Sequence, residues 1–245
     1  MRALALEWKK EKRTGVKAVL LMAGLAGASY AAANFLVRKE ALFRLPLAPM
    51  DILLTQLYGV LLMMNMFGII VATAMIYQME YRGNVIRRLY LLPVSIPAVY
   101  VSKFVILTVM LLAAVVIQNL MLTCLGVRYL PEDIFEWLTV LRFAVYSFVT
   151  SMPVLAFMLF VSSCSENMWA GLGVGVIGFL SGMACAVSAA GGLLHPFVVM
   201  LQPALAMSAQ PDSGIVVIAL LHTLCWLLAG CWKAKYSCCE GGGIV

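Results

Sequence analysis

Long apolar runs, separated by short stretches rich in charge or proline, dominate the pattern of the chain. Six of them come close to or exceed the about 20 residues that a helix needs to cross a bilayer. They cover 15–37, 53–77, 104–126, 138–162, 168–190 and 214–232. Backbone groups in hydrocarbon must pair within their own segment, and the short alternating segments of a membrane barrel are absent. The pattern therefore predicts an all-α, polytopic fold with a single transmembrane domain over 1–245.

Composition and charge support a membrane protein and indicate its orientation. The chain is 64% hydrophobic and 11% charged, against about 25% charged residues in soluble domains. The net charge of +6 would suit nucleic acid, but the basic residues flank the apolar runs, as orientation signals do. With a cytoplasmic N-terminus, 12 basic residues lie inside and 5 outside. Both termini, with the tail 233–245, are therefore expected in the cytoplasm, and no nucleic-acid partner is expected.

The first residues, 1–14, precede the first apolar run and mix both signs of charge. Leu4 and Trp8 are one helical turn apart, which predicts a short amphipathic helix along the inner leaflet. The alternative is a solvated basic flank that only sets orientation. A cleaved signal peptide is disfavoured, because the apolar run and the segment before it are both too long.

The segment 191–213 is apolar but broken by Pro196, Pro203 and Pro211. Two short helices bounded by these prolines and dipping into the outer face would suit it. Irregular backbone at that depth has to be shielded by protein or line a wet cavity. An ordinary interfacial loop is the alternative.

Catalytic and metal-binding motifs are missing from the sequence. It contains no HExxH, GxSxG or Walker A motif. His195 and His222 are its only histidines, and none of the seven cysteines forms a CxxC pair. We therefore expect no enzyme activity and no metal site. Cys238 and Cys239 in the tail are expected to be plain thiols, with acylation or redox chemistry as the alternative.

Glycines form a stripe in the fifth apolar run. A GxGxxG match there is a false positive, because no strand precedes it. The better account is a helix face that lets another helix approach closely, within the subunit or across a dimer. The face comprises Gly171, Gly175, Gly178 and Gly182.

The interiors of the predicted spans carry neutral polar groups rather than charges. Ion pumps and proton-coupled carriers usually keep an ionisable group there. Energy for any transport would therefore come from elsewhere, most simply from a separate ATPase subunit.

Residues 78–98, between the second and third runs, are charged and contain two prolines. Helical spacing over 78–92 places Tyr81 and Val85 on an apolar face, with Glu80 and Arg87 roughly opposite. Pro93 is expected to end this helix. Ser95 would then cap a new helix that runs through Lys103 into the third span. Binding of this basic loop to anionic lipid is the alternative to a protein-docking role.

Taken together, these segments resemble the membrane subunit of an ABC-2-type exporter, and most closely the permeases of lantibiotic-protection transporters. The resemblance rests on the charged helix around Glu7 and Trp8, the six spans, the loop from Glu80 to Lys103 and the broken outer segment. It extends over nearly the whole chain.

The resemblance implies that the 78–98 loop is a coupling helix that docks into an ATPase subunit. The implied docking residues are Glu80, Tyr81, Arg82, Gly83, Arg87 and Arg88. It also implies two ATPase copies that carry ATP and Mg, and a second permease, identical or homologous, in a bacterial cytoplasmic membrane with its lipids. The expected cargo is a lantibiotic-like or other amphipathic peptide, or a lipid-like substrate, exported for self-protection. A membrane scaffold or channel, or a membrane-embedded enzyme, is the rival hypothesis.

Overall fold

A computed structural model describes residues 2–10, 15–82, 95–131, 133–186, 192–206 and 208–241, with the backbone alone at 2, 3, 82, 192 and 237–241. The described elements are helical. In chain order they are α1 (Arg2–Lys10), α2 (Val16–Leu42), α3 (Pro49–Asp51), the π-helical turn η2 (Ile52–Gln56), α4 (Tyr58–Arg82), α6 (Ile96–Tyr129), α7 (Trp137–Cys164), α8 (Met168–Cys185), the 3₁₀ turn η3 (Gly192–Leu194), α9 (Pro196–Leu205) and α10 (Ser213–Gly241).

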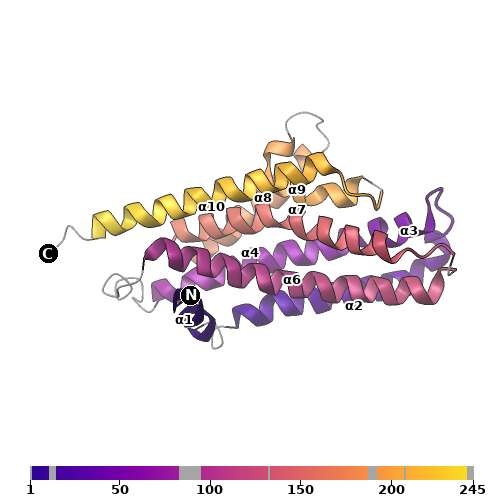
Figure 1. The fold of residues 1–245 in the computed structure, drawn as a ribbon, viewed down its shortest axis with the longest axis horizontal. Coiled ribbons are helices and arrows are strands. Elements are labelled where there is room, and N and C mark those ends of the chain that lie inside the picture. The colour runs from indigo at the N-terminus through magenta and orange to yellow at the C-terminus, as the bar shows by residue number, and fades with distance from the viewer. Residues whose placement is uncertain are drawn as a thin grey trace.

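The long helices run side by side along the longest axis of the molecule (Figure 1). Six stretches of the described chain are long and apolar enough to cross a membrane, and they correspond to α2, α3–η2–α4, α6, α7, α8 and α10. The predicted all-α fold with six candidate spans is thus confirmed. α1 and the end of α10 lie at the same end of the bundle, and α3 lies at the other (Figure 1). We call the end with α1 the N-terminal end.

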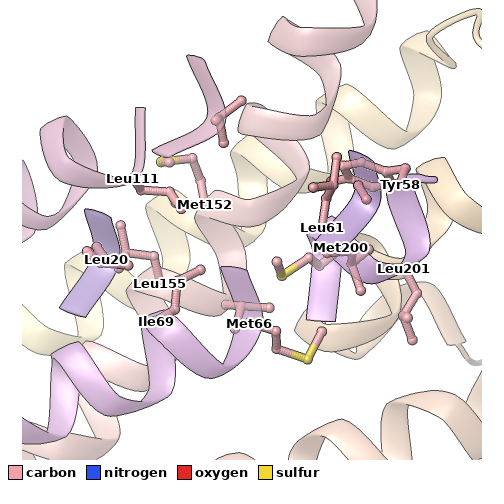
Figure 2. Packing of buried hydrophobic residues seen from close by; sticks show 14 of the residues in the cluster. Leu20, Tyr58, Leu61, Met66, Ile69, Leu111, Met152, Leu155, Met200 and Leu201 are labelled. Carbon is pink, nitrogen blue, oxygen red and sulfur yellow. The ribbon is translucent and has the colours of Figure 1, made fainter. Parts of the chain in front are cut away.

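The core is centred on α4 and α7. In each, 61% of the most apolar window is buried, against 17% in α10. Leu20 of α2, Ile69 of α4, Leu111 of α6 and Leu155 of α7 belong to one buried cluster (Figure 2). The peripheral helices α8 and α10 therefore expose most of their apolar surface.

Two helices extend well beyond the hydrophobic runs that predicted them. The second span, expected over 53–77, belongs to a helical stretch Pro49–Tyr81, and the third, expected over 104–126, belongs to Ile96–Tyr129. An apolar run ends near the first charged residue, so the predicted span ends there too. The helix itself can continue past that residue when its charge is paired within the protein. Glu80 and Lys103 find partners, as described below.

The described helices extend from both sides into the predicted 78–98 segment. Residues 78–82 complete α4, and 96–98 already belong to α6. Ser95 is the residue before α6 and has an extended backbone, with Pro97 in the first turn, as predicted. Its hydroxyl, however, makes no capping hydrogen bond.

The outer segment differs from its prediction in one respect. The described part contains the short turn η3 and a single helix, α9, which starts at Pro196 but keeps Pro203 inside it. Pro203 removes one backbone hydrogen bond without ending the helix. Phe197, Val199 and Met200 are at most 1% exposed, so burial of α9 among its neighbours outweighs that loss. These side chains of α9 are therefore shielded by the protein, and the dip of 191–213 into the membrane stays a prediction.

Candidate functional site

Four charged side chains from three helices meet at the N-terminal end of the bundle. Lys103 of α6 places its Nζ 2.7 Å from Glu7 Oε2 of α1 and 2.8 Å from Glu80 Oε1 of α4. Lys10 of α1 pairs with the same Oε1 of Glu80, and its Nζ lies 3.6 Å from Glu7 Oε1. We call these residues, Glu7, Lys10, Glu80 and Lys103, the charge cluster.

The charge cluster is buried apart from Lys10. The Lys103 side chain is 1% exposed, and those of Glu80 and Glu7 are 4% and 5% exposed, whereas that of Lys10 is 29% exposed. Two carboxylates balance two ammonium groups, which is the condition under which buried charge is tolerated. Removing one partner from a buried pair typically costs about 3–5 kcal/mol, because the other charge is left without compensation.

Local sequence places each member of the cluster. Glu7 and Lys10 are three residues apart, so they share one side of α1. Glu80 lies two residues before the end of α4, and Lys103 lies in the second turn of α6. Tyr77, one turn before Glu80, has its ring centroid 5.7 Å from Lys103 Nζ. The Glu80–Lys103 ion pair therefore joins the two helices on either side of 83–94.

A second polar contact ties α4 to α7 and α10 at the same end. The Tyr81 hydroxyl donates to the Ser163 carbonyl oxygen at 3.0 Å. Lys233 of α10 donates to the same oxygen, and its Nζ lies 3.4 Å from Ser163 Oγ. Consecutive residues of α4, Glu80 and Tyr81, thus bind to different neighbouring helices.

Comparison with known proteins decides the family. Residues 3–182, almost three quarters of the chain, match the family model described as "ABC-2 family transporter protein". The chain belongs to the ABC-2 transporter family. No curated protein and no solved structure was found to match it.

Membership makes the protein a multi-pass membrane permease subunit of an ABC transporter. An ABC-2 permease is not itself catalytic, because ATP is hydrolysed by a separate ATPase subunit, which is its partner. Among the residues that the structure describes, no group of three or more His, Cys, Asp or Glu side chains could hold a metal ion.

The predicted docking residues of the permease divide into two groups. Glu80 is 3% exposed and faces the charge cluster, and Tyr81 is partly buried with its hydroxyl bonded to Ser163. Arg82 is the last residue of α4, and only its backbone is described. Gly83, Arg87 and Arg88 lie outside the described residues. Glu80, predicted as a surface contact, thus has its partners inside the permease.

The pattern of the sequence does not identify Lys103, Glu7 and Lys10 as partners of Glu80. A signal for them was present, because a charged residue next to a membrane span requires a partner nearby. The sequence does not show which distant charge it will meet. Only the fold brings together residues separated by 96 positions, as in the hydrogen bond between Lys103 and Glu7.

The glycine stripe packs against neighbours in the same chain. A Cβ at Gly175 would lie 2.6 Å from Ile70 Cγ2 of α4. At Gly178 and Gly182 it would lie 2.4 and 2.8 Å from atoms of Phe197 of α9. Gly171 is less tight, with Ser162 Oγ 3.6 Å away. At three of the four glycines, a side chain of α4 or α9 therefore packs so close to the α8 backbone that an alanine would collide with it.

A pair of amides joins α4 and α6 in the middle of the bundle. Asn65 Nδ2 donates to Gln118 Oε1 at 2.8 Å, and Gln118 Nε2 donates to Asn65 Oδ1 at 2.9 Å. Both residues are 1% exposed. Gly27 of α2 adjoins them, since a Cβ there would lie 3.0 Å from Gln118 Nε2. The pair satisfies its polar groups without any charge at this depth.

Proposed function

We propose that the permease is half of the membrane part of an ATP-driven exporter, in which two permeases, identical or homologous, join two ATPase subunits. The ATPase would dock on the segment that starts at the end of α4. Arg82, Gly83, Arg87 and Arg88 are the proposed contacts. Glu80 and Tyr81 would hold the base of this segment instead of touching the partner through their side chains.

The observation that carries the proposal is the ion pair between Glu80 and Lys103. It links the two helices that flank 83–94 at 2.8 Å, inside the protein. A displacement of the docking segment would therefore move α4 and α6 together, and Glu7 and Lys10 would carry the same movement to α1. Helices joined by buried charge pairs are suited to transmit force, because separating the pairs is costly.

The described spans support ATP as the source of energy. The middle of the bundle contains the neutral pair Asn65–Gln118, and the charged residues of the described spans lie near the helix ends. An ion-coupled carrier would be expected to keep an ionisable group at this depth.

The proposed cargo is a cationic, amphipathic peptide of the lantibiotic type, or another amphipathic peptide or lipid-like molecule, exported for self-protection. This part rests on the resemblance described above. Two acidic residues at the outer face have structural roles: Asp51 Oδ1 accepts from the Ala209 N–H, and Asp212 Oδ1 from the Gly214 N–H, both at 2.8 Å. Attraction of a cationic peptide would therefore fall to the remaining acidic groups there, such as Glu40 and Asp133.

The proposed location is a bacterial cytoplasmic membrane with both termini in the cytoplasm. The basic residues favour this orientation, and α1 and the end of α10 lie at the same end of the bundle (Figure 1). Reporter fusions at the two ends should both report cytoplasm.

Co-purification and a survival assay test the function. The tagged permease should bring an ATPase from its native membrane. Cells that express both subunits should tolerate more lantibiotic than cells whose ATPase lacks its catalytic residue. Failure to recover any ATPase would refute the exporter assignment. Recovery of an ATPase without protection would refute only the cargo.

A further inference from the structure

The sides of α1 differ in what they contact. Glu7 is 4% exposed and is paired with Lys103. Leu4 and Trp8, one turn apart on another edge, are 38% and 36% exposed. We call Leu4 and Trp8 the apolar edge of α1. The helix thus turns an anionic side chain into the protein and leaves large apolar side chains outside, the reverse of a helix on a water-soluble protein.

The apolar edge is fixed beside the start of the first span. Lys17, the second residue of α2, places its Nζ 3.5 Å from the centroid of the Trp8 ring and donates to the Trp8 carbonyl oxygen at 3.2 Å. Tryptophan and lysine are enriched where spans leave the hydrocarbon. Trp8 and Lys17 are thus of the residue types typical of the depth of the lipid headgroups.

Charge in this region suits an anionic surface. The first 17 residues include six basic and two acidic residues. Glu7, one of the two acidic residues, does not offset the positive charge at the surface, because it is buried in the charge cluster. Lys9, next to Trp8, is exposed. Basic residues beside a span attract anionic lipid, and each strengthens the attraction.

We propose that anionic phospholipid of the adjoining leaflet binds the apolar edge of α1 and thereby regulates the charge cluster on its other side. Lipid that holds Leu4 and Trp8 keeps α1 in place, so Glu7 stays on Lys103 and Lys10 stays on Glu80. Without that lipid α1 is held less firmly, and Lys103 keeps Glu80 as its single carboxylate partner within the cluster. The binding stands by itself, whereas its effect on coupling rests on the proposed function.

Lipid fits the apolar edge better than the ATPase does. The edge consists of a leucine and a tryptophan beside the first residues of a span, where any occupant meets the bilayer. An ATPase is a soluble partner and would need polar contacts around its docking site. The competing hypothesis is that the ATPase covers Trp8, in which case ATPase binding would protect Trp8 from quenching by lipid.

Quenching of Trp8 fluorescence tests the binding in nanodiscs that contain the permease alone. The probe is phosphatidylglycerol with brominated chains, in a background of phosphatidylcholine. The signal of Trp8 is the difference between the wild type and Trp8→Phe. Brominated phosphatidylglycerol should quench this signal about tenfold more effectively than brominated phosphatidylcholine at equal mole fraction. In a second arm the ATPase is added to the same nanodiscs. Equal quenching by both lipids, or loss of quenching after the ATPase is added, would overturn the proposed binding.

Lipid titration of the permease–ATPase complex tests the regulation. Transport per ATP hydrolysed should rise with phosphatidylglycerol in the wild type and respond less in Leu4→Ser. Leu6→Ser is the matched control, because Leu6 is 58% exposed but lies away from the apolar edge, and it should respond as the wild type does. Glu7→Gln should keep the quenching and lose the response.

The two assays separate the possible failures. Selective quenching with no effect of lipid on coupling in the wild type would overturn the regulation. A complex that fails to transport in any lipid would refute the proposed function instead, and the quenching assay would still decide whether the lipid binds α1.

Discussion

Lys103 Nζ lies 2.8 Å from Glu80 Oε1, and this contact connects the start of α6 to the end of α4. Neither residue has access to water that could replace its partner, since they are 1% and 3% exposed. Loss of either partner would therefore leave the other charge buried without full compensation.

Substitution of Lys103 should destabilise the permease severely. In Lys103→Met, Glu7 and Glu80 remain buried with Lys10 as their one common cation, so we expect a loss of about 3–5 kcal/mol. Thermal unfolding in detergent measures it. Lys10→Met should cost less, because the Lys10 side chain is 29% exposed and water screens it.

A double-mutant cycle checks that the loss arises from the pair. The double variant Glu80→Gln with Lys103→Met should lose less free energy of unfolding than the sum of the two single variants. The reason is that each single variant already removes the shared ion pair. Strict additivity of the two losses would show that Glu80 and Lys103 do not depend on each other.

The glycine stripe should not tolerate side chains where the contacts are shortest. Gly175→Ala places a Cβ 2.6 Å from Ile70 Cγ2, and we expect a cost of about 1–3 kcal/mol from overpacking. Gly173→Ala is the control in the same helix, because nothing lies within 4 Å of its Cβ position. Ile70→Ala should relieve much of the effect of Gly175→Ala. Equal stability of the two glycine variants would contradict the packing described for α8.

The amide pair in the middle of the bundle should also show coupling. Asn65→Leu leaves the Gln118 amide unpaired in an apolar surrounding, with an expected cost of about 1–2 kcal/mol. Asn65→Leu with Gln118→Leu should recover part of that loss, because no polar group is then left without a partner. Unfolding of the three variants in the same bicelles measures the difference.

Acid should weaken the packing of α9 against α8 through His195. Burial lowers the pKa of His195 below its usual value of 6.5, and its Nε2 lies 3.2 Å from Ser181 Oγ. The folded state thus favours the neutral imidazole, and the unfolded state binds a proton first. The contribution of His195 is complete above about pH 6.5 and declines as pH falls toward the lowered pKa. His195→Gln should unfold with a flatter pH dependence between pH 7 and pH 5.

The overall fold could be predicted from the sequence because a bilayer restricts the choice. Long apolar runs with charge at their ends have one common solution, a bundle of helices. The start of α6 after Ser95 was predictable for a similar reason, since Pro97 suits a first turn. Pro203 was misinterpreted as a boundary, because its local effect was opposed by the tertiary burial of Phe197 and its neighbours.

The site was only partly predictable. The sequence indicates that Glu80 is important in the loop, but it does not predict that the Glu80 side chain is buried. Helical periodicity places Glu80 opposite the apolar residues of a short helix, and for a free helix this means water. In the structure that side faces Lys103 and α1, so a polar side is buried by charge pairing. Periodicity distinguishes apolar from polar sides and does not tell which polar side meets a partner.

The ratio of substrate transported to ATP hydrolysed, in vesicles that contain the permease and its ATPase, tests the central claim most directly. Glu80→Gln should leave ATPase binding intact, since the Glu80 side chain faces the charge cluster, and should lower this ratio several-fold because the link between α4 and α6 is weakened. Tyr81→Phe, which loses the hydrogen bond from the Tyr81 hydroxyl to the Ser163 carbonyl oxygen of α7 at 3.0 Å and keeps all four residues of the charge cluster, should lower it less. A ratio unchanged in Glu80→Gln, with the protein folded and the ATPase bound, would contradict the account.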